Sequence, residues 1–530
     1  MHLEFHRYGP RALLISFAGA PDKAAFFRQG RLLGALKRHA PAGLLEAVPS
    51  FTRILLVFSE SLLCDAAIPG LAGLGVDVES GGEPELGRLV ELPVAYGGPD
   101  LERVAQSASL SPNDVVSAHA APEYLVHCLG FSPGFPYLGG LDRRLETPRL
   151  PTPRVRVPSG SVAIGGGHTG VYSVTGPGGW NLVGASSIAI FSPWAPTLRE
   201  QFAVMPGDRV RFIPQGWRDS ADWMKEPAPR SISEAGEDAT NGDRPVLRVL
   251  SPGLGITIQD AGRPGFRRLG VPPSGAMDPT AARWANRLLD NPPELPVLEC
   301  CLQGQRIEVL EAGWVAITGD PGMGSGRRTG WSAVRVRAGD VLEFPPQERG
   351  VWRYVAIPGG ISAARFLGSA STLPRAGIGS VIAPGRAFFR SSAATFSPPD
   401  ATAARRVPWS EVPDRVANVV LPVWPGPQWT WFPEEARENF FRAEWQISSQ
   451  CDRTGYRLQG PRIQPDAREM TSEPVLPGTI QVPSGGSPIV TMPDGPTLGG
   501  YPKLGIIESC DLWRLAQCGP GHRVKFVRAV

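Results

Sequence analysis

The sequence predicts a mainly β protein whose two halves carry the same strand-and-turn unit. The chain has 63 glycines and 56 prolines among 530 residues, and they are spread between apolar segments. This is about a fifth of the chain, against an average of about 12%. Residues 474–503 alternate apolar residues with Gly and Pro, and no run is long enough for a helix. Residues 157–160 and 482–485 both read VPSG.

The VPSG match belongs to a longer internal repeat. GGW at 178–180 follows it in the first half, and GGY at 499–501 follows it in the second. Each copy closes on a similar segment, PGDRVRF at 206–212 and PGHRVKF at 520–526. Three matched blocks in one order predict two related β domains.

Composition limits the classes of partner. The net charge of +3 comes from 53 basic and 50 acidic residues, which argues against a nucleic-acid surface or a polybasic membrane anchor. No apolar run approaches the 18 residues or so of a membrane span. Seven cysteines without CxxC spacing indicate reduced thiols in a cytoplasmic protein. The apolar segment after Arg11 is interpreted as a first strand, since Glu4 precedes it and Pro21 follows.

A chain of this length predicts several domains. We expect a small α+β domain at 1–85, a β-barrel at 86–216, a polar linker at 217–245, a further domain at 246–410 and a second β-barrel at 411–530.

Apolar runs and caps place the elements. Asp22, Asp100, Ser111 and Asp278 are expected helix N-caps. The expected strands are residues 12–17, 54–58, 89–94, 246–250, 314–318, 333–336, 341–344, 351–357 and 419–421.

Three glycine-rich motifs are weak chemical signals. GFSPG at 130–134 matches a nucleophile elbow, but Pro133 has no N–H for an oxyanion and opposes the required helix, so we expect a rigid loop lining a pocket. GDPGMGSGRR at 319–328 lacks the Lys-Ser/Thr of a phosphate loop; a β-turn with solvated arginines is the simpler interpretation, and anion binding by the loop N–H groups with Arg327 and Arg328 is the alternative. GGGH at 165–168 predicts a turn at a strand edge.

Polar residues set in Gly/Pro turns are the candidate site residues, because β-rich folds build sites from such loops. The histidines show no metal-binding spacing, so no metal site is expected. Asp452–Arg453 is also compatible with a structural ion pair, and Asp278 is better explained as a helix cap. The candidates are Gln259, Asp260, Arg263, Ser274, Asp452, Arg453, Arg457, Glu473, Gln481, Tyr501 and Lys503, with His127, Ser159 and His168 from the first half.

Long motifs resemble a known family over nearly the whole chain. Residues 127–141, 154–172 and 176–184 resemble the B component of 5-oxoprolinase, also described as allophanate hydrolase subunit 1 or KipI. In the second half, residues 251–292, 371–380 and 451–461, with the TIQVPSGGSPIV and GGYPKLG segments, resemble the C component, the KipA or allophanate hydrolase subunit 2 type. The chain thus looks like a B–C fusion and is similar to the carboxyltransferase region of urea carboxylase. This resemblance implies cyclophilin-like β-barrels.

The resemblance also implies chemistry on a planar amide. A 5-oxoprolinase opens 5-oxo-L-proline to glutamate with ATP and Mg²⁺, so a separate A-type 5-oxoprolinase protein is the expected partner and a small amide the expected substrate. Within the matched motifs, Asp260, Asp452 and Glu473 are the acid/base candidates, and Arg263, Arg453 and Lys503 are candidates for holding oxygens. We expect residues 474–503 to line the site and the segment near Val157 to face it.

Two alternatives remain open. Urea carboxylase moves a carboxyl group from carboxybiotin, but this chain has no Ala-Met-Lys-Met biotin motif, so a carboxyltransferase would use biotin on another protein. A KipI-like regulator of a histidine kinase would need only the first half. An assembly of identical chains is left open.

Overall fold

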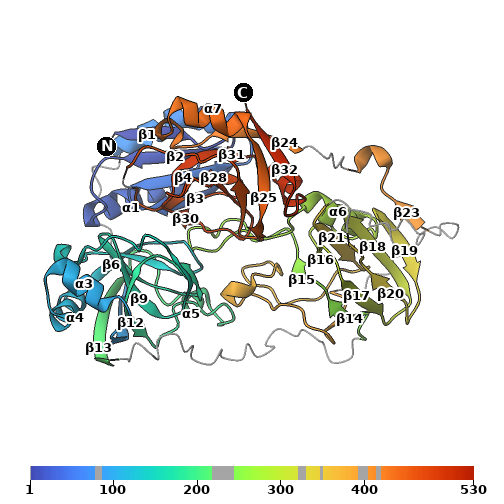
Figure 1. The fold of residues 1–530 in the computed structure, drawn as a ribbon, viewed down its shortest axis with the longest axis horizontal. Coiled ribbons are helices and arrows are strands. Elements are labelled where there is room, and N and C mark those ends of the chain that lie inside the picture. Colours follow the sequence, from blue (N-terminus) through green and yellow to red (C-terminus); the bar gives the residue numbers. More distant parts are fainter. Residues whose placement is uncertain are drawn as a thin grey trace.

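The computed structural model has a mainly β architecture of two closed barrels, a small α+β domain and a β domain at one end (Figure 1). This confirms the predicted fold class. The structure describes residues 2–77, 86–217, 244–319, 330–346, 350–391, 404–412, 419–468 and 470–529. Residues 320–328 of the GDPGMGSGRR motif and nearly all of the expected linker lie outside these ranges.

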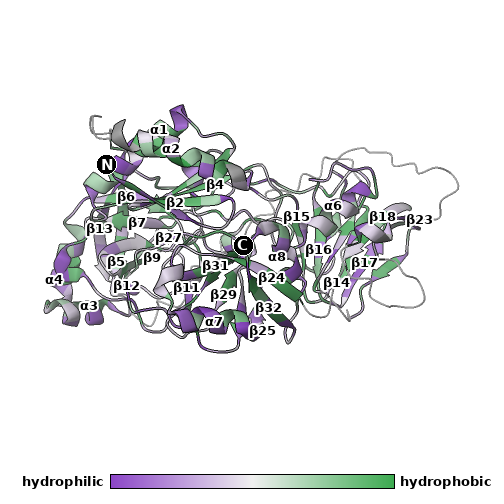
Figure 2. Ribbon diagram, turned by 90° about the horizontal axis from the view of Figure 1, so that it is seen from above, coloured by the Kyte–Doolittle hydropathy of each residue, from purple (hydrophilic) through white to green (hydrophobic). Residues whose placement is uncertain are grey.

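The N-terminal domain is a four-stranded sheet in the order β1-β2-β4-β3, with α1 and α2 on one face (Figure 2). Leu13 and Ile15 of β2 pack toward the helices, while Leu14 packs with Ile506 of the distant C-terminal part. Because both faces of the sheet are covered at β2, nearly all residues of this strand are apolar. The elements are β1 (Leu3–Arg7), β2 (Ala12–Phe17), α1 (Lys23–Arg38), β3 (Leu44–Ser50), β4 (Arg53–Phe58) and α2 (Ser61–Asp77).

The first barrel closes in the order β10-β7-β6-β13-β5-β12-β9. Its first and last strands, β5 and β13, pair in parallel. The barrel strands are β5 (Leu89–Tyr96), β6 (Tyr124–Leu129), β7 (Pro136–Gly139), β9 (Ser161–Gly165), β10 (His168–Val171), β12 (Asn181–Ser186) and β13 (Arg209–Trp217). The pair β8 (Arg154–Val157) and β11 (Gly176–Gly178) and the helices α3 (Leu101–Ala108), α4 (Pro112–Ala120) and α5 (Leu198–Gln201) complete it.

The next domain packs two sheets around an apolar core that includes Val249, Leu298 and Val355. One sheet has the order β20-β17-β14-β22 and the other β15-β16-β21-β18-β19-β23. The elements are β14 (Leu247–Pro252), β15 (Ile256–Gln259), α6 (Pro279–Arg287), β16 (Val297–Cys301), β17 (Gln305–Val309), β18 (Gly313–Gly319), β19 (Ser332–Val336), β20 (Val341–Glu343), β21 (Trp352–Ala356), β22 (Ala387–Phe388) and β23 (Ala404–Arg406).

The second barrel repeats the topology of the first. Its order is β24-β31-β28-β29-β26-β25-β32, and its first and last strands, β24 and β32, again pair in parallel. The barrel strands are β24 (Val419–Pro425), β25 (Glu444–Cys451), β26 (Gly455–Gln459), β28 (Thr479–Gln481), β29 (Ile489–Thr491), β31 (Lys503–Ile507) and β32 (Arg523–Arg528). The pair β27 (Glu473–Pro474) and β30 (Leu498–Gly499) and the helices α7 (Glu434–Arg442) and α8 (Ser509–Ala516) accompany them.

The two VPSG blocks do not occupy equivalent positions, although the repeat itself is confirmed. The first leads into β9, whereas the second follows β28. The structural counterpart of Gly160 is Gly478. The N–H of each glycine donates to the chain on one side, and its carbonyl accepts an N–H from the chain on the other side. That N–H belongs to Ser186 for Gly160 and to Ile507 for Gly478. Their φ angles are +84° and +90°, and a Cβ would lie 2.6 and 2.1 Å from those residues' carbonyl oxygens. This position therefore requires glycine in both barrels.

The capping predictions hold with one correction. Asp22, Ser111 and Asp278 each accept a backbone N–H in the first turn of α1, α4 or α6. Asp100 makes no such bond to α3. Its carboxylate instead accepts from the N–H of Leu182 and from Arg154, each at 2.7 Å, so a charge-assisted tertiary pair replaces the expected cap.

The expected strands are found. They correspond to β2, β4, β5, β14, β18, β19, β20, β21 and β24, with ends that differ by a few residues. All seven cysteines are free thiols. Within the described ranges, no helix has the length and apolar character needed to cross a bilayer.

The two halves of the chain are interlocked. Leu269, Val271 and Phe366, all from the second half, belong to the core of the first barrel. Conversely, the N-terminal sheet packs on the second barrel, where the Tyr8 hydroxyl lies 2.7 Å from that of Thr479. Each half therefore supplies part of the other's buried surface.

We predict that the halves stay associated without a covalent connection. A protease site inserted between residues 217 and 245 and then cleaved should leave two fragments that elute together in size-exclusion chromatography, since the apolar surfaces they share would otherwise be exposed to water. Separation of the fragments in 150 mM salt would contradict this.

Candidate functional site

A cavity of about 930 Å³ lies between the two barrels. Segments of both barrels and the 371–380 segment line it. Its size suits an organic ligand of several rings or two smaller ligands. Its lining residues include Phe131, Ser132, Phe135, Tyr137, Arg149, Tyr172, Trp180, Arg375, Cys451, Asp452, Arg457, Ser472, Gln481, Ser484, Thr491, Asp494, Leu498 and Tyr501.

The wall from the first barrel is aromatic. The Phe135 ring lies edge-on to Tyr137, Tyr172 and Trp180, with ring centroids 5.1 to 5.5 Å apart. Such tilted contacts are the favoured geometry for aromatic pairs. The wall is therefore rigid and mostly apolar. The close packing of the rings also requires glycine at positions 165, 170 and 178, because a Cβ there would lie within 3.2 Å of Trp180, Phe135 or Tyr172.

The wall from the second barrel is polar. Asp452 is exposed, and its Oδ1 accepts from the N–H groups of Thr454 and Gly455 at 2.7 and 3.2 Å. The described residues offer its Oδ2 no hydrogen bond. Gln481 donates to Thr491 at 2.9 Å, and Tyr501 is 38% exposed. Four candidates from the sequence, these three and Arg457, thus share one cavity.

Arginines are the commonest charged residues among the described residues that line the cavity. Arg149, Arg375 and Arg457 line it together with Asp452 and Asp494. The Asp494 carboxylate is already paired with Arg453 behind the wall. The lining therefore has three arginines and one carboxylate that Arg453 does not hold, and guanidinium matches the geometry of carboxylate and phosphate oxygens.

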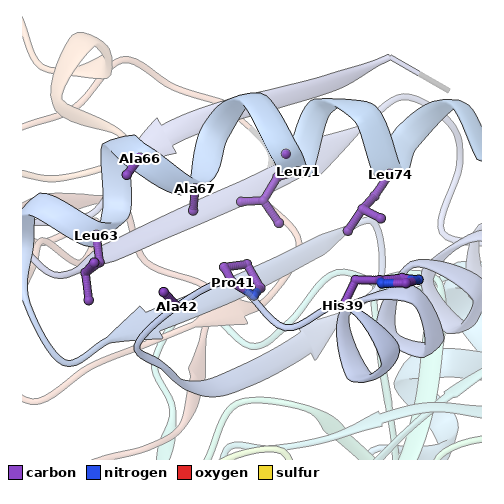
Figure 3. Close-up of a pocket in the computed structure, with 9 residues that line it drawn as sticks. His39, Pro41, Ala42, Leu63, Ala66, Ala67, Leu71 and Leu74 are labelled. Carbon is purple, nitrogen blue, oxygen red and sulfur yellow. The ribbon is translucent and has the colours of Figure 1, made fainter.

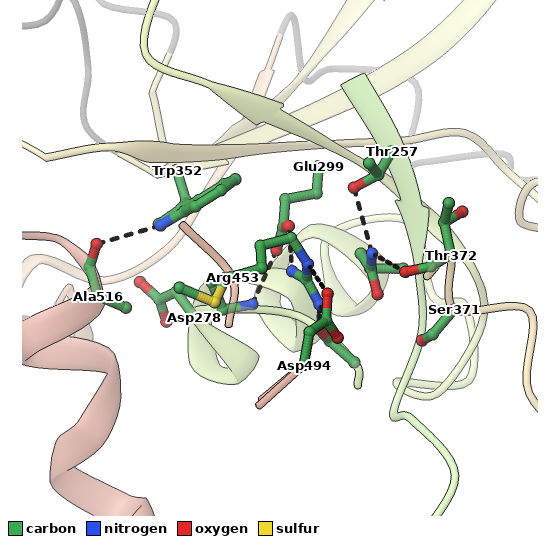
Figure 4. A network of polar contacts seen from close by, with 12 residues as sticks. Thr257, Asp278, Glu299, Trp352, Ser371, Thr372, Arg453, Asp494 and Ala516 are labelled. Carbon is green, nitrogen blue, oxygen red and sulfur yellow. Dashed lines mark hydrogen bonds and ion pairs between the residues drawn. The ribbon is translucent and has the colours of Figure 1, made fainter. Parts of the chain in front are cut away.

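Arg453 holds this wall in place (Figure 4). Its Nε and Nη2 donate to Asp494 at 2.7 and 3.2 Å, its Nη1 pairs with Glu299, and its Nη2 also reaches the carbonyl of Gly275 at 2.7 Å. Burial opposes the charge, but the two carboxylates outweigh it and raise the pKa of the Arg453 guanidinium. The Glu299 carboxylate also accepts from Tyr354 at 2.9 Å. A structural ion pair, the alternative interpretation of Arg453 from the sequence, describes this residue, but its partners are Asp494 and Glu299 and not Asp452.

The candidates at 259–274 lie behind the cavity and do not line it. The Asp260 carboxylate accepts from Ser369, Ala370, Ser371 and Gly262, so it organises two loops. Gln259 donates to the carbonyl of Thr372.

Arg263 and Ser274 complete this group. Arg263 is 1% exposed and donates to the carbonyl of Ser371. Burial lowers its pKa to about 10. Ser274 adopts a φ of +53° and donates its N–H to Pro493 at 3.1 Å. A direct catalytic role for Asp260 remains a prediction, and Asp260 does not line the cavity.

Glu473 and Lys503 form a fully buried pair between the N-terminal domain and the second barrel. The Lys503 ammonium lies 2.6 Å from Glu473, which also accepts from Gln428 at 2.7 Å and pairs with Arg53 at 3.0 Å. Burial lowers the pKa of Lys503. Neither residue lines the cavity, so neither would contact a ligand bound there.

The first-half candidates also lie outside the cavity. The His127 and His168 rings contact Phe51, with centroids 5.7 and 4.6 Å away. Burial lowers the pKa of each to about 4, with help from His168 for the former and Arg149 for the latter. Ser159 donates to the carbonyl of Ser173 at 3.0 Å and fixes its turn.

Two motif predictions are confirmed. Ser132 and Pro133 line the cavity in a loop without a following helix, and GGGH forms the turn between β9 and β10. Sequence reasoning missed Arg149 and Arg375 as lining residues, whereas Asp494 lies in the 474–503 stretch that was expected to line the site. Arg375 lies in the family motif at 371–380, which was the available signal; Arg149 has no local signal, since only the fold brings it 3.4 Å from Ser472.

A second, smaller cavity of about 270 Å³ lies in the N-terminal domain, beside α2 (Figure 3). Its wall is apolar except for His39, so it presents no group of polar residues for chemistry. The residues are His39, Pro41, Ala42, Leu63, Ala66, Ala67, Gly70, Leu71 and Leu74.

The chain matches two family models. Residues 3–199 match "Carboxyltransferase domain, subdomain C and D", and residues 269–528 match "Carboxyltransferase domain, subdomain A and B". The solved structure of TTHA0988 is 33% identical, covers 98% of this chain and 100% of its own, and has a TM-score of 0.83.

Curated relatives match each half separately. The 5-oxoprolinase C component of Escherichia coli K12 is 36% identical over 293 residues, which are 53% of this chain and 91% of that protein. The B component of Escherichia coli O157:H7 is 47% identical over 176 residues, 32% of this chain and 78% of that protein. The urea amidolyase of Lachancea kluyveri is 30% identical over 309 residues, 53% of this chain and 17% of its own length.

Loss of Arg453 should destabilise the protein. Arg453→Met leaves Glu299 and Asp494 buried without their cation, so we expect the free energy of unfolding to fall by about 3–5 kcal/mol. The matched control is Arg442→Met, whose exposed pair with Glu438 should contribute less than about 1 kcal/mol. Urea denaturation followed by circular dichroism measures both, and equal losses would contradict the assignment.

His127 should make stability depend on pH. Its pKa is about 4 when folded and about 6.5 when unfolded. The neutral His127 ring therefore contributes fully to the free energy of unfolding above about pH 6.5. This contribution is lost as the pH falls toward 4, by up to about 3 kcal/mol.

The slope of unfolding free energy against pH between 4.5 and 6 tests this. His127→Phe should lower it by up to about 1.4 kcal/mol per pH unit. Identical slopes for wild type and His127→Phe would refute the assignment.

Proposed function

The chain belongs to the family of 5-oxoprolinase B and C components, and we propose that it is the fused B–C component of an ATP-dependent 5-oxoprolinase. In this proposal a separate A-type protein completes the enzyme. The observation that supports it best is the cavity, whose lining requires both halves.

The lining suits a lactam that carries a carboxylate. An arginine such as Arg457 would bind the carboxylate of 5-oxo-L-proline through paired N–H bonds. Tyr501 and Gln481 would donate to the lactam oxygen, and the aromatic wall would exclude water from the planar ring.

Asp452 is the proposed proton acceptor. Water would attack the lactam carbonyl carbon while Asp452 takes one of its protons; the C–N bond then breaks, and Asp452 returns that proton to the nitrogen to give the amine of glutamate. The open Oδ2 and the solvent exposure of Asp452 suit this task better than the fully bonded carboxylate of Asp260.

ATP and Mg²⁺ belong to the complex in this proposal. The lining does not form a fitted magnesium site, because Arg453 holds the Asp494 carboxylate and Asp452 alone remains. Hydrolysis of ATP to ADP and phosphate in the complete complex would supply the free energy that drives opening of a stable lactam. No step assigned to this chain passes through the nucleotide.

The test is glutamate release from 5-oxo-L-proline. We expect release only when this chain, an A-type 5-oxoprolinase protein and ATP are all present. Arg457→Gln should raise the KM for 5-oxo-L-proline about 10- to 100-fold, the equivalent of a lost charge-assisted hydrogen bond. Arg442→Gln, on the exposed face of α7, is the control and should leave KM unchanged. No release from two folded proteins would reject the proposal.

A carboxyl transfer from biotin on another protein is the second candidate. The names of both family models and the similarity to urea amidolyase favour it. A biotinylated protein co-purifying with this chain, and inhibition by avidin, would support it over the first. The kinase-regulator hypothesis needs the first half alone and gives no role to a cavity built from both.

A further inference from the structure

The tip of the β3–β4 hairpin, residues 50–53, lies where the two barrels meet. Phe51 adopts a φ of +48°, which side-chain-bearing residues rarely do, and it is 3% exposed. Gln29 of α1 donates to the carbonyls of Phe51 and Arg53 at 2.8 and 3.0 Å. The surrounding structure therefore holds the tip in an uncommon conformation.

On one side, the tip supports the aromatic wall of the cavity. The Phe51 ring lies 5.7 Å from Tyr137, edge-on, and belongs to the same buried cluster as Tyr172 and Trp180. Tyr137, Tyr172 and Trp180 line the cavity, whereas Phe51 does not. Phe51 thus packs against the wall from behind.

On the other side, the tip binds the polar wall. The Ser50 hydroxyl donates to the carbonyl of Ser472 at 2.7 Å, and Arg53 pairs with Glu473 at 3.0 Å. Ser472 lines the cavity, and its hydroxyl accepts from Tyr137 and Arg149 of the first barrel, each at 3.4 Å. Three neighbouring residues of one hairpin therefore contact both walls.

We propose that Phe51 is a positioning residue that sets the separation of the two cavity walls, and that the N-terminal domain acts as a wedge between the barrels. The residues that line the cavity come from elsewhere in the chain, so this domain acts through Tyr137 and Ser472 and not through the ligand. The rate readout of the inference rests on the proposed function, while the distance readout does not.

Phe51→Ala is the test variant, and Phe26→Ala is its matched control. Phe26 is an aromatic residue of the same domain that contacts His127 of the first barrel, 5.9 Å between centroids, but is not part of the cluster behind the wall. Phe51→Leu keeps apolar bulk at the tip. In the complete complex, we expect Phe51→Ala to lower kcat about 10- to 100-fold, since small misplacements of reacting groups have effects of that size. Phe51→Leu should recover most of the loss, and Phe26→Ala should stay within about twofold of wild type.

The second measurement needs no activity. A ketone-bearing amino acid at the exposed positions 155 and 438, on β8 and α7, carries spin labels and leaves the native cysteines untouched. Pulsed electron paramagnetic resonance on the full chain should give one narrow distance for wild type and Phe26→Ala. Phe51→Ala should broaden or shift it, and Phe51→Leu should restore it.

The outcomes separate the two proposals. If the complete complex does not act on 5-oxo-L-proline, the proposed function fails, and the distance measurement still decides the role of Phe51. Unchanged distances in a folded Phe51→Ala protein would overturn the wedge. A rate loss shared equally by Phe26→Ala would also overturn it, since the effect would then be general destabilisation.

Discussion

The buried guanidinium of Arg453 is the interaction on which the candidate site depends. It carries the only charge that compensates Asp494 and Glu299 at hydrogen-bonding distance among the described residues, and these acids come from the second barrel and the preceding domain. Removing two carboxylates from water is costly unless a cation meets them in good geometry. The same contact therefore fixes the position of one domain against the next and withdraws one acid from the chemistry of the cavity.

Charge and shape are divided between the two barrels. One barrel contributes interlocked aromatic rings, and the other contributes carboxylate, amide and hydroxyl groups on turns. Neither set makes an enclosed site alone. The N-terminal sheet and the loops around Leu269 and Phe366 bring them together, because each is buried in the half to which it does not belong by sequence.

The sequence predicted local structure well because caps, glycine turns and apolar runs act over a few residues. The strands and three of four caps follow from such signals. Asp100 departs from its expected role because Arg154, 54 positions away, offers a stronger partner than a helix N–H. The two VPSG segments are identical in sequence but are not structurally equivalent for a similar reason. The strand hydrogen bonds make Gly478 the counterpart of Gly160. For the site, Asp452, Arg457, Gln481 and Tyr501 were accessible from motifs, whereas Arg149 and Phe51 gain their positions only through tertiary contacts.

Both walls of the cavity belong to one chain, so assembly of the cavity does not depend on protein concentration. With both walls on one polypeptide, closing the site is an intramolecular event, and each wall has an effective concentration of the order of millimolar around the other. Two separate chains would lose half of their complete sites once diluted to their dissociation constant. The joined chain keeps the same fraction at any dilution, and it fixes the ratio of the two walls at one to one.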